Sequence, residues 1–172
     1  LSVGAINTNL IKKKLRGYAS INAQTGEALD THSFATLIGV GATTVNPYLA
    51  LDSLYQRFEK KLFGNFGYDE CIDRFIQSVN YGLLKIMSKM GISVLSSYRG
   101  GCNFETVGLS RTVASEYFPG VLSKISGIGL SGIENKLRII HKQAFESNNL
   151  VLPIGGLYRY RKNGETHQYQ GK

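Results

Sequence analysis

Residues 30–50 read DTHSFATLIGVGATTVNPYLA, which contains a short helix signal, a glycine break and the start of a second helix. Apolar residues at helical spacing predict the first helix around residues 33–40. Asn46 followed by Pro47 predicts the second start, because an asparagine oxygen can cap free N–H groups and proline has no N–H to lose. This alternation of short elements around a glycine turn is typical of α/β proteins.

Two longer helices are predicted after this segment. The first carries apolar residues at helical spacing over residues 51–62. The second follows Gly67, ends at Gly91, and places one apolar stripe along its length: Ile72, Phe75, Ile76, Val79, Leu83, Met87 and Met90. Residues 92–95 then form a compact strand candidate.

The flanking sequence predicts further short elements. Toward the N-terminus we expect a helix near residues 5–15, a strand near residues 18–23 and a turn at Thr25-Gly26. Residues 121–126 are another strand candidate. A last helix is predicted from Ser131, with Glu134 three residues later forming a capping box, and a polar hairpin or tail is predicted around Asn163-Gly164.

These elements predict an α/β fold with a partial or open barrel-like arrangement of short strands and amphipathic helices. The predicted strands are too few to close a sheet, and the chain of 172 residues starts at Leu1 rather than Met. We therefore expect an incomplete domain that belongs to a longer polypeptide. Such a piece should expose large apolar patches where neighbouring parts would pack.

Composition excludes several classes of protein. Hydrophobic residues make up 42% of the chain and charged residues only 19%, which argues against a disordered tail. Charged residues interrupt every long apolar segment, so no bilayer-spanning run is predicted. Two cysteines cannot form a disulfide framework, and no secretory leader pattern is present, which together predict a cytoplasmic location.

Two glycine-rich segments could bind phosphate groups. Residues 127–132 match the GxGxxG pattern of dinucleotide sites, but no acidic residue ends the following apolar segment, residues 150–154, where the ribose would be bound. Residues 39–44 form a second glycine turn, without the lysine that a phosphate-binding loop requires. Both are predicted to be structural turns.

The histidines and cysteines do not form a recognisable catalytic set. His32 lies beside Asp30 and could act as a general base, although no nucleophile accompanies it in sequence. Cys102 follows Arg99, a cation that could lower a thiol pKa, but no companion base is evident. The remaining members of these types are His141, His167 and Cys71. We predict no catalytic, cofactor-binding or metal-binding residue in this chain.

The excess of basic residues gives a formal charge of +8 and raises the alternative of a stand-alone module that binds single-stranded nucleic acid. Residues 158–162, YRYRK, combine cations with aromatic rings on which bases could stack. Residues 12–14 and 60–61 are the other basic clusters. Because the clusters are short and spread along the chain, solvated helix faces explain them better.

Several segments together resemble a known family. SFATLIGVGATTVNPYLA (33–50), LLKIMSKMGISVLSSYRGG (83–101), FETVGL (104–109), SGIGLSGIENKLRIIHKQAF (126–145) and GGLYRYRKNGETH (155–167) occur in the order found in the large, glutamine-dependent glutamate synthase polypeptide. The resemblance covers nearly the whole chain, and MSKMGIS together with VNPYLA is a specific combination.

The resemblance implies a position in the latter part of the family's central region, which connects the glutaminase domain to the FMN-binding synthase domain. Members form glutamate from glutamine and 2-oxoglutarate with FMN and an iron–sulfur cluster. The family's catalytic cysteine, flavin-binding residues and cluster ligands do not map onto this chain, so activity of the chain by itself stays open. We expect residues 1–156 to belong to the central domain and residues 157–172 to lead toward the FMN domain. The other domains of the large subunit are the expected partners.

Overall fold

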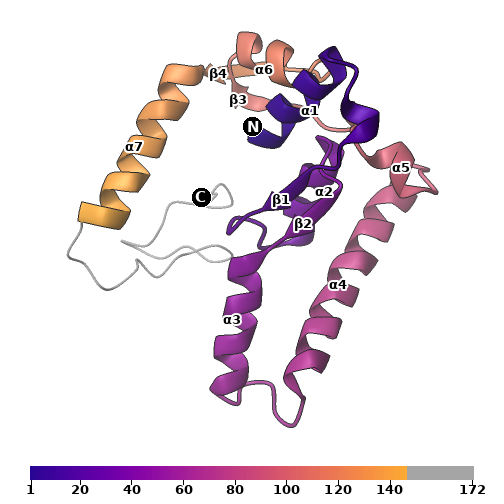
Figure 1. Ribbon diagram of the computed structural model, residues 1–172, viewed down its shortest axis with the longest axis vertical. Coiled ribbons are helices and arrows are strands. Elements are labelled where there is room, and N and C mark those ends of the chain that lie inside the picture. The colour runs from indigo at the N-terminus through magenta and orange to yellow at the C-terminus, as the bar shows by residue number, and fades with distance from the viewer. Residues whose placement is uncertain (147–172) are drawn as a thin grey trace. The chain divides into compact units, whose positions relative to one another are not determined.

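The computed structural model describes residues 1–146, which form seven α-helices, one 3-10 helix and four short strands (Figure 1). The elements in chain order are α1 Ser2–Lys12, η1 Arg16–Tyr18, β1 Asn22–Gln24, α2 Thr31–Gly39, β2 Thr44–Asn46, α3 Tyr48–Glu59, α4 Tyr68–Lys89, α5 Leu95–Tyr98, β3 Val107–Leu109, α6 Arg111–Tyr117, β4 Ile125–Ile128 and α7 Leu130–Glu146. The chain divides into two compact units, Leu1–Leu130 and a second that begins at Ser131. Almost all of α7 belongs to the second unit.

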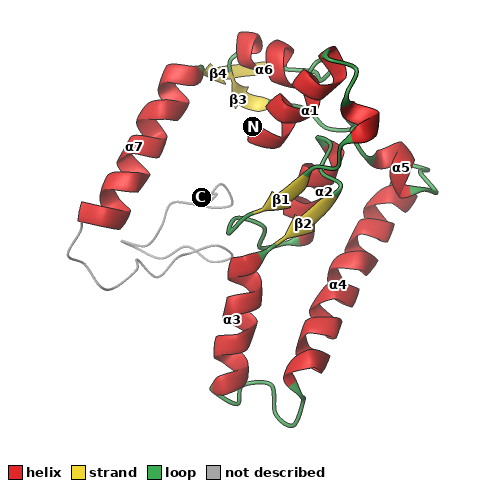
Figure 2. Ribbon diagram, in the orientation of Figure 1, coloured by secondary structure: helices red, strands yellow, loops and turns green. Residues whose placement is uncertain are grey.

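The first unit contains two β-α-β modules, each with two parallel strands (Figure 2). Parallel neighbours cannot be joined by a tight turn, so the chain crosses over through α2 in the first module and through α6 in the second. In the first module Ala23 lies opposite Val45. In the second, Val107 lies opposite Ile125, and the register then shifts before Leu109 meets Ile128.

A small core joins α2 to α4 and α5. It contains Ala35, Ile38, Met87 and Tyr98, all less than 9% exposed. Burial raises the pKa of the Tyr98 hydroxyl group above its ordinary value, because the charged phenolate loses its hydration there. This core anchors the C-terminal end of α4 to the first β-α-β module.

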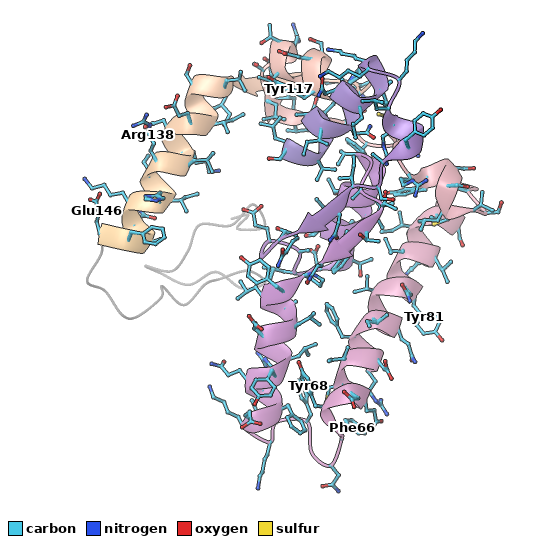
Figure 3. All side chains as sticks on the ribbon, in the orientation of Figure 1. Phe66, Tyr68, Tyr81, Tyr117, Arg138 and Glu146 are labelled. Atoms are coloured by element: carbon cyan, nitrogen blue, oxygen red, sulfur yellow. The ribbon has the colours of Figure 1, made fainter. Side chains whose placement is uncertain are left out.

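Helices α3 and α4 form an antiparallel hairpin that extends from this core (Figure 1). The two helices meet near their turn through aromatic rings, with Tyr68 of α4 in edge-to-face contact with Tyr55 and close to Phe58 of α3. Figure 3 shows Tyr68 on the side of α4 that faces α3. Nearer the C-terminal end of α4, Gly82 lies against the side chain of Thr31, so α2 can approach closely.

Helix α1 packs against α6 of the second module. The Thr8 hydroxyl donates a hydrogen bond to the Tyr117 carbonyl oxygen over 3.1 Å, and Gly4 lies directly against the Phe118 ring. Both contacts join residues more than one hundred positions apart in sequence, so they tie the N-terminal helix to the second β-α-β module.

Five predicted helices are confirmed, as α1, α2, α3, α4 and α7, with ends shifted by a few residues. Two predicted caps are wrong. Asn46 is the last residue of β2, where its carbonyl oxygen accepts from the Thr25 N–H, and the cap position of α3 is occupied by Pro47. Ser131 is the second residue of α7, and the Glu134 carboxylate accepts from Arg138 instead.

The strand predictions were less accurate. Residues 92–95 are not a strand, because Val94 caps the short helix α5, which begins at Leu95. The strand expected at residues 18–23 starts only at Asn22, since Tyr18 ends a 3-10 turn, and the one expected at 121–126 starts at Ile125. Helix α6 and strands β2 and β3 were not predicted.

The mixture of helices and parallel strands confirms the α/β class. In the described residues the strands form two separate two-stranded sheets, so the barrel-like arrangement stays a prediction. The expected domain boundary at residues 156–157 and the hairpin at Asn163-Gly164 lie outside the described residues. No helix within residues 1–146 has both the length and the apolar character needed to cross a bilayer.

Candidate functional site

An apolar cleft of about 530 Å³ lies between the α3–α4 hairpin and the first β-α-β module. The helices contribute its walls, and the end of β2 contributes its floor. Its lining residues are Phe34, Ile38, Thr43, Thr44, Val45, Asn46, Pro47, Leu51, Ile72, Phe75, Ile76, Val79, Asn80, Leu83 and Leu95. None of these side chains is an acid, a base or a thiol, so the cleft is suited to binding rather than to proton transfer or nucleophilic attack.

The stripe predicted on α4 builds one wall of this cleft. Ile72, Ile76, Val79 and Leu83 recur every three or four residues and therefore lie on one side of the helix. Ile76 is 47% exposed, which is unusual for the centre of such a stripe. The sequence signal was present, but periodicity alone does not say whether a stripe meets a core or an open cleft.

A second apolar surface lies on the β3–β4 sheet. Val107 is 66% exposed and Ile125, opposite it, 61%. Parallel sheets are normally covered on both faces, and a sheet of two strands is marginal alone. In the described residues this sheet therefore leaves apolar side chains exposed.

The GxGxxG segment, residues 127–132, is divided between β4 and the start of α7. Gly127 lies against the backbone of Gly108 in β3, at a distance that leaves no room for a side chain. Gly108 has a φ of +81°, which favours glycine. Close strand pairing explains Gly127 without a bound phosphate.

The second glycine turn, residues 39–44, is held by Arg16. The Arg16 guanidinium donates to the Gly41 carbonyl oxygen at 2.8 Å, to the Ala19 carbonyl oxygen at 2.6 Å and to Asn7 Oδ1 at 2.6 Å. Gly41 has a φ of +118° and packs against Asn7, so a side chain at this position would be strained. The turn joins α1 to the first β-α-β module.

Asp30 and His32 occupy the start of α2. Asp30 is the N-cap, and its Oδ1 accepts from the Ser33 N–H and the Ser33 hydroxyl, both at 2.8 Å. These hydrogen bonds, chiefly that from the Ser33 backbone, lower the pKa of the Asp30 carboxyl group below its ordinary value. His32 is exposed in the first turn. The sequence suggested His32, beside Asp30, as a general base. In the structure Asp30 instead caps helix α2.

Asp30→Ala should destabilise the folded chain by about 1 kcal/mol, the usual value of an N-cap. A carboxyl group with a lowered pKa stabilises the fold above its unfolded pKa, and this contribution disappears as the pH falls through the lower folded value. Urea unfolding at pH 7 and at about pH 3 should show a smaller difference between wild type and variant at the acid pH. An equal difference at both pH values would contradict the assignment.

The two cysteines and His141 lie far apart in sequence and in different segments of the described chain. Cys71 is buried in α4, and Cys102 lies in a loop with its Sγ 3.7 Å from the Gly100 and Pro119 carbonyl oxygens. His141 packs against the Phe145 ring one turn later in α7, at 4.6 Å between ring centres. His167 lies outside the described residues.

The basic clusters within the described residues are exposed and belong to different elements. Residues 12–14 end α1, and residues 60–61 follow α3 in the hairpin turn. Residues 158–162, the best candidate for base stacking, lie outside the described residues. The two described clusters thus belong to two different helices and the segments that follow them.

The resemblance implies FMN and an iron–sulfur cluster for the full-length family, and we predict no binding residue for either in this chain. An iron–sulfur cluster requires several cysteine thiolates, whereas the whole sequence has two cysteines. In the GxGxxG segment, Gly127 lies against the backbone of Gly108. Among residues 1–146, no group of three or more His, Cys, Asp or Glu side chains could hold a metal ion.

Comparison with known proteins identifies relatives along the whole chain. A family model described as the glutamate synthase central domain matches residues 1–110. The chain is 51% identical over 171 residues to the glutamate synthase (NADPH) large chain of Azospirillum brasilense, covering 99% of this chain. It is 39% identical over 173 residues to the glutamate synthase (NADPH) large chain of Bacillus subtilis, and 37% identical over 176 residues to the ferredoxin-dependent glutamate synthase 2 of Synechocystis.

The chain spans only 11% of the length of each of these three relatives. Neither the family model nor the relatives support the alternative of a nucleic-acid-binding module.

Proposed function

The chain belongs to the glutamate synthase central-domain family, and from this membership we propose that it is a structural module rather than a catalyst. In this role it connects the glutaminase domain to the FMN-binding domain of a large chain that forms glutamate from glutamine and 2-oxoglutarate. FMN and the iron–sulfur cluster belong to other parts of that polypeptide. We place the protein in the cytoplasm, because its two cysteines are unpaired thiols.

The observation that carries this proposal is the exposed apolar surface of the first unit. Val107 and Ile125 present apolar side chains outward from a sheet that needs further strands and covering helices. Each β-α-β module consists of a strand, a helix and a second, parallel strand. This is the repeating unit of an open α/β barrel. We propose that neighbouring parts of the large chain extend these sheets, with residues 157–172 leading to the FMN domain.

An exchange of segments tests the proposal. The Azospirillum brasilense large chain carries the corresponding segment at 51% identity, and replacing it with this chain should preserve the ratio of glutamate formed to glutamine consumed. In the same chimera, Val107→Asp together with Ile125→Asp should lower that ratio severalfold while glutamine hydrolysis continues, because apolar contacts between domains are lost.

The isolated chain serves as the second arm of this experiment. It should not hydrolyse glutamine or reduce 2-oxoglutarate, since the lining of its cleft holds no reactive group. Turnover by the isolated chain that disappears on replacing one side chain, such as His32 or Cys102, would overturn the structural role.

A further inference from the structure

We propose that the apolar cleft between the α3–α4 hairpin and the first β-α-β module binds a basic amphipathic helix. This inference rests on the proposed function, because it names the chemistry of the segment that this module would meet. Two features of the cleft define that segment: an apolar lining that matches one face of a helix, and an acidic margin on its open side.

The apolar lining fits the periodic face of an α-helix. Leu51 of α3 and Ile72, Ile76, Val79 and Leu83 of α4 face the same space. A helix that docks in an apolar groove presents residues at i, i+3, i+4 and i+7 to such a lining. Its polar backbone groups are already satisfied internally, so an apolar groove can accept it without leaving donors or acceptors unpaired.

Acidic residues continue the outer edge of this lining along α4. Asp69 precedes Ile76 by seven residues, and Asp73 precedes Asn80 by seven, so each lies on the same stripe as a cleft residue. Both aspartates are exposed and make no ion pair with another described residue. Asp69 also lies in the first turn of α4, where the helix dipole stabilises a negative charge.

Helix α3 places acids on the same side of the hairpin. Asp52 and Glu59 are seven residues apart and follow the inward-facing Leu51 and Phe58 by one position. In α4, Asp69 and Asp73 likewise follow the inward-facing Tyr68 and Ile72 by one position. Because the helices are antiparallel and meet face to face, the same rotation on each brings both acidic edges to the same side.

The side of the hairpin away from these acids is either covered by α2 or carries a basic residue. Gly82 and Phe75 of α4 pack against α2, which closes that side of the cleft. Arg74 is held away from the cleft by its ion pair with Glu70 and by the Phe66 ring, which Figure 3 labels near the turn of the hairpin. The open side thus carries negative charge although the whole chain has a formal charge of +8.

This contrast makes the inference specific. A cationic peptide is repelled by the net charge of the chain, so it can bind preferentially only through a local acidic site. An acidic peptide with the same apolar face would be favoured by the net charge but repelled at the cleft margin. The sign of the preference therefore reports on the cleft.

The test uses the intact 172-residue chain and two designed, fluorescently labelled helical peptides. Both have leucine at i, i+3, i+4 and i+7, and their flanking positions are lysine in one peptide and glutamate in the other. Fluorescence anisotropy at low salt should show the lysine peptide binding about tenfold more tightly, with the preference shrinking at high salt. Equal affinities, a preference for glutamate, or no binding of either peptide would overturn the inference.

Matched variants locate the site. Asp69→Asn with Asp73→Asn should remove most of the tenfold preference, whereas Glu27→Gln with Glu116→Gln changes the net charge equally at exposed positions elsewhere and should leave it intact. Ile76→Ala should weaken the lysine peptide about fivefold, while Tyr81→Ala, on the opposite side of α4, should not. If the two charge-matched pairs behave alike, the cleft is not the site.

The outcome is separable from that of the proposed function, because peptide binding involves no glutamate synthase activity. Suppose that the chimera preserves the ratio of glutamate formed to glutamine consumed, but that the chain binds neither peptide. Only the present inference would then be contradicted. Peptide binding with the predicted preference, together with an uncoupled chimera, would remove the connecting role instead.

Discussion

Gly127→Ala is expected to destabilise the chain by about 3 kcal/mol, since overpacking against a backbone that cannot move away is among the costliest small substitutions. The added methyl group would occupy the position of the Gly108 carbonyl group in the neighbouring strand. Relief requires β3 and β4 to separate, which breaks the pairing of Val107 with Ile125. Urea unfolding followed by circular dichroism should show a clearly lower midpoint.

The control for this variant is Gly17→Ala, the same chemical change in the 3-10 turn η1. A Cβ atom at Gly17 meets nothing within 4 Å. Replacing a glycine in an unstrained position restricts the unfolded chain, so Gly17→Ala should leave stability unchanged or raise it by up to about 1 kcal/mol. Equal midpoints for the two variants would show that β3 and β4 do not approach as closely as described.

Arg16→Ala is expected to cost about 3 kcal/mol, because hydrogen bonds from a charged donor contribute more than neutral ones. The guanidinium bonds to Asn7 in α1, to Ala19 after η1 and to Gly41 in the turn before β2. Its loss leaves three acceptors without their partner and disconnects α1 from the first β-α-β module. The free energy of urea unfolding measures the effect.

Arg16→Lys separates charge from geometry. Lysine keeps the positive charge but cannot reach three acceptors in different directions with one planar group, so we expect it to recover less than half of the lost stability. Lys13→Ala, at an exposed position three residues earlier, should change stability by no more than about 0.5 kcal/mol. Full rescue by lysine would mean that charge alone, rather than the fork of hydrogen bonds, joins these segments.

Much of the helical structure could be predicted from sequence, because each long helix carries its own periodic signal. The stripe from Ile72 to Met87 predicted α4, and Gly67 and Gly91 marked its ends. The strands were harder, because each has only three or four residues. A strand of that length is stabilised by its neighbour rather than by its own sequence, so β3 gave no signal that could be read without β4.

The candidate site shows the same division. The sequence pointed to Asp30, His32 and the glycine motifs as candidate sites. In the structure Asp30 caps a helix, and Gly127 lies against the neighbouring strand. The cleft was not predicted, because Leu51 and Ile76 come from different helices and only the hairpin brings them to one space. Asp52 and Asp73 also come from different helices, and only the hairpin places them on the same side of the cleft.

Family membership, the α/β class and the positions of the long helices were thus available from the order of residues alone. Those properties depend on local periodicity and on segments that can be compared one by one. The pairing of β3 with β4, the role of Arg16 and the existence of an acidic-edged apolar cleft required the folded chain. Each of them depends on atoms that are distant in sequence and approach within a few ångströms only after packing, and no local pattern encodes that approach.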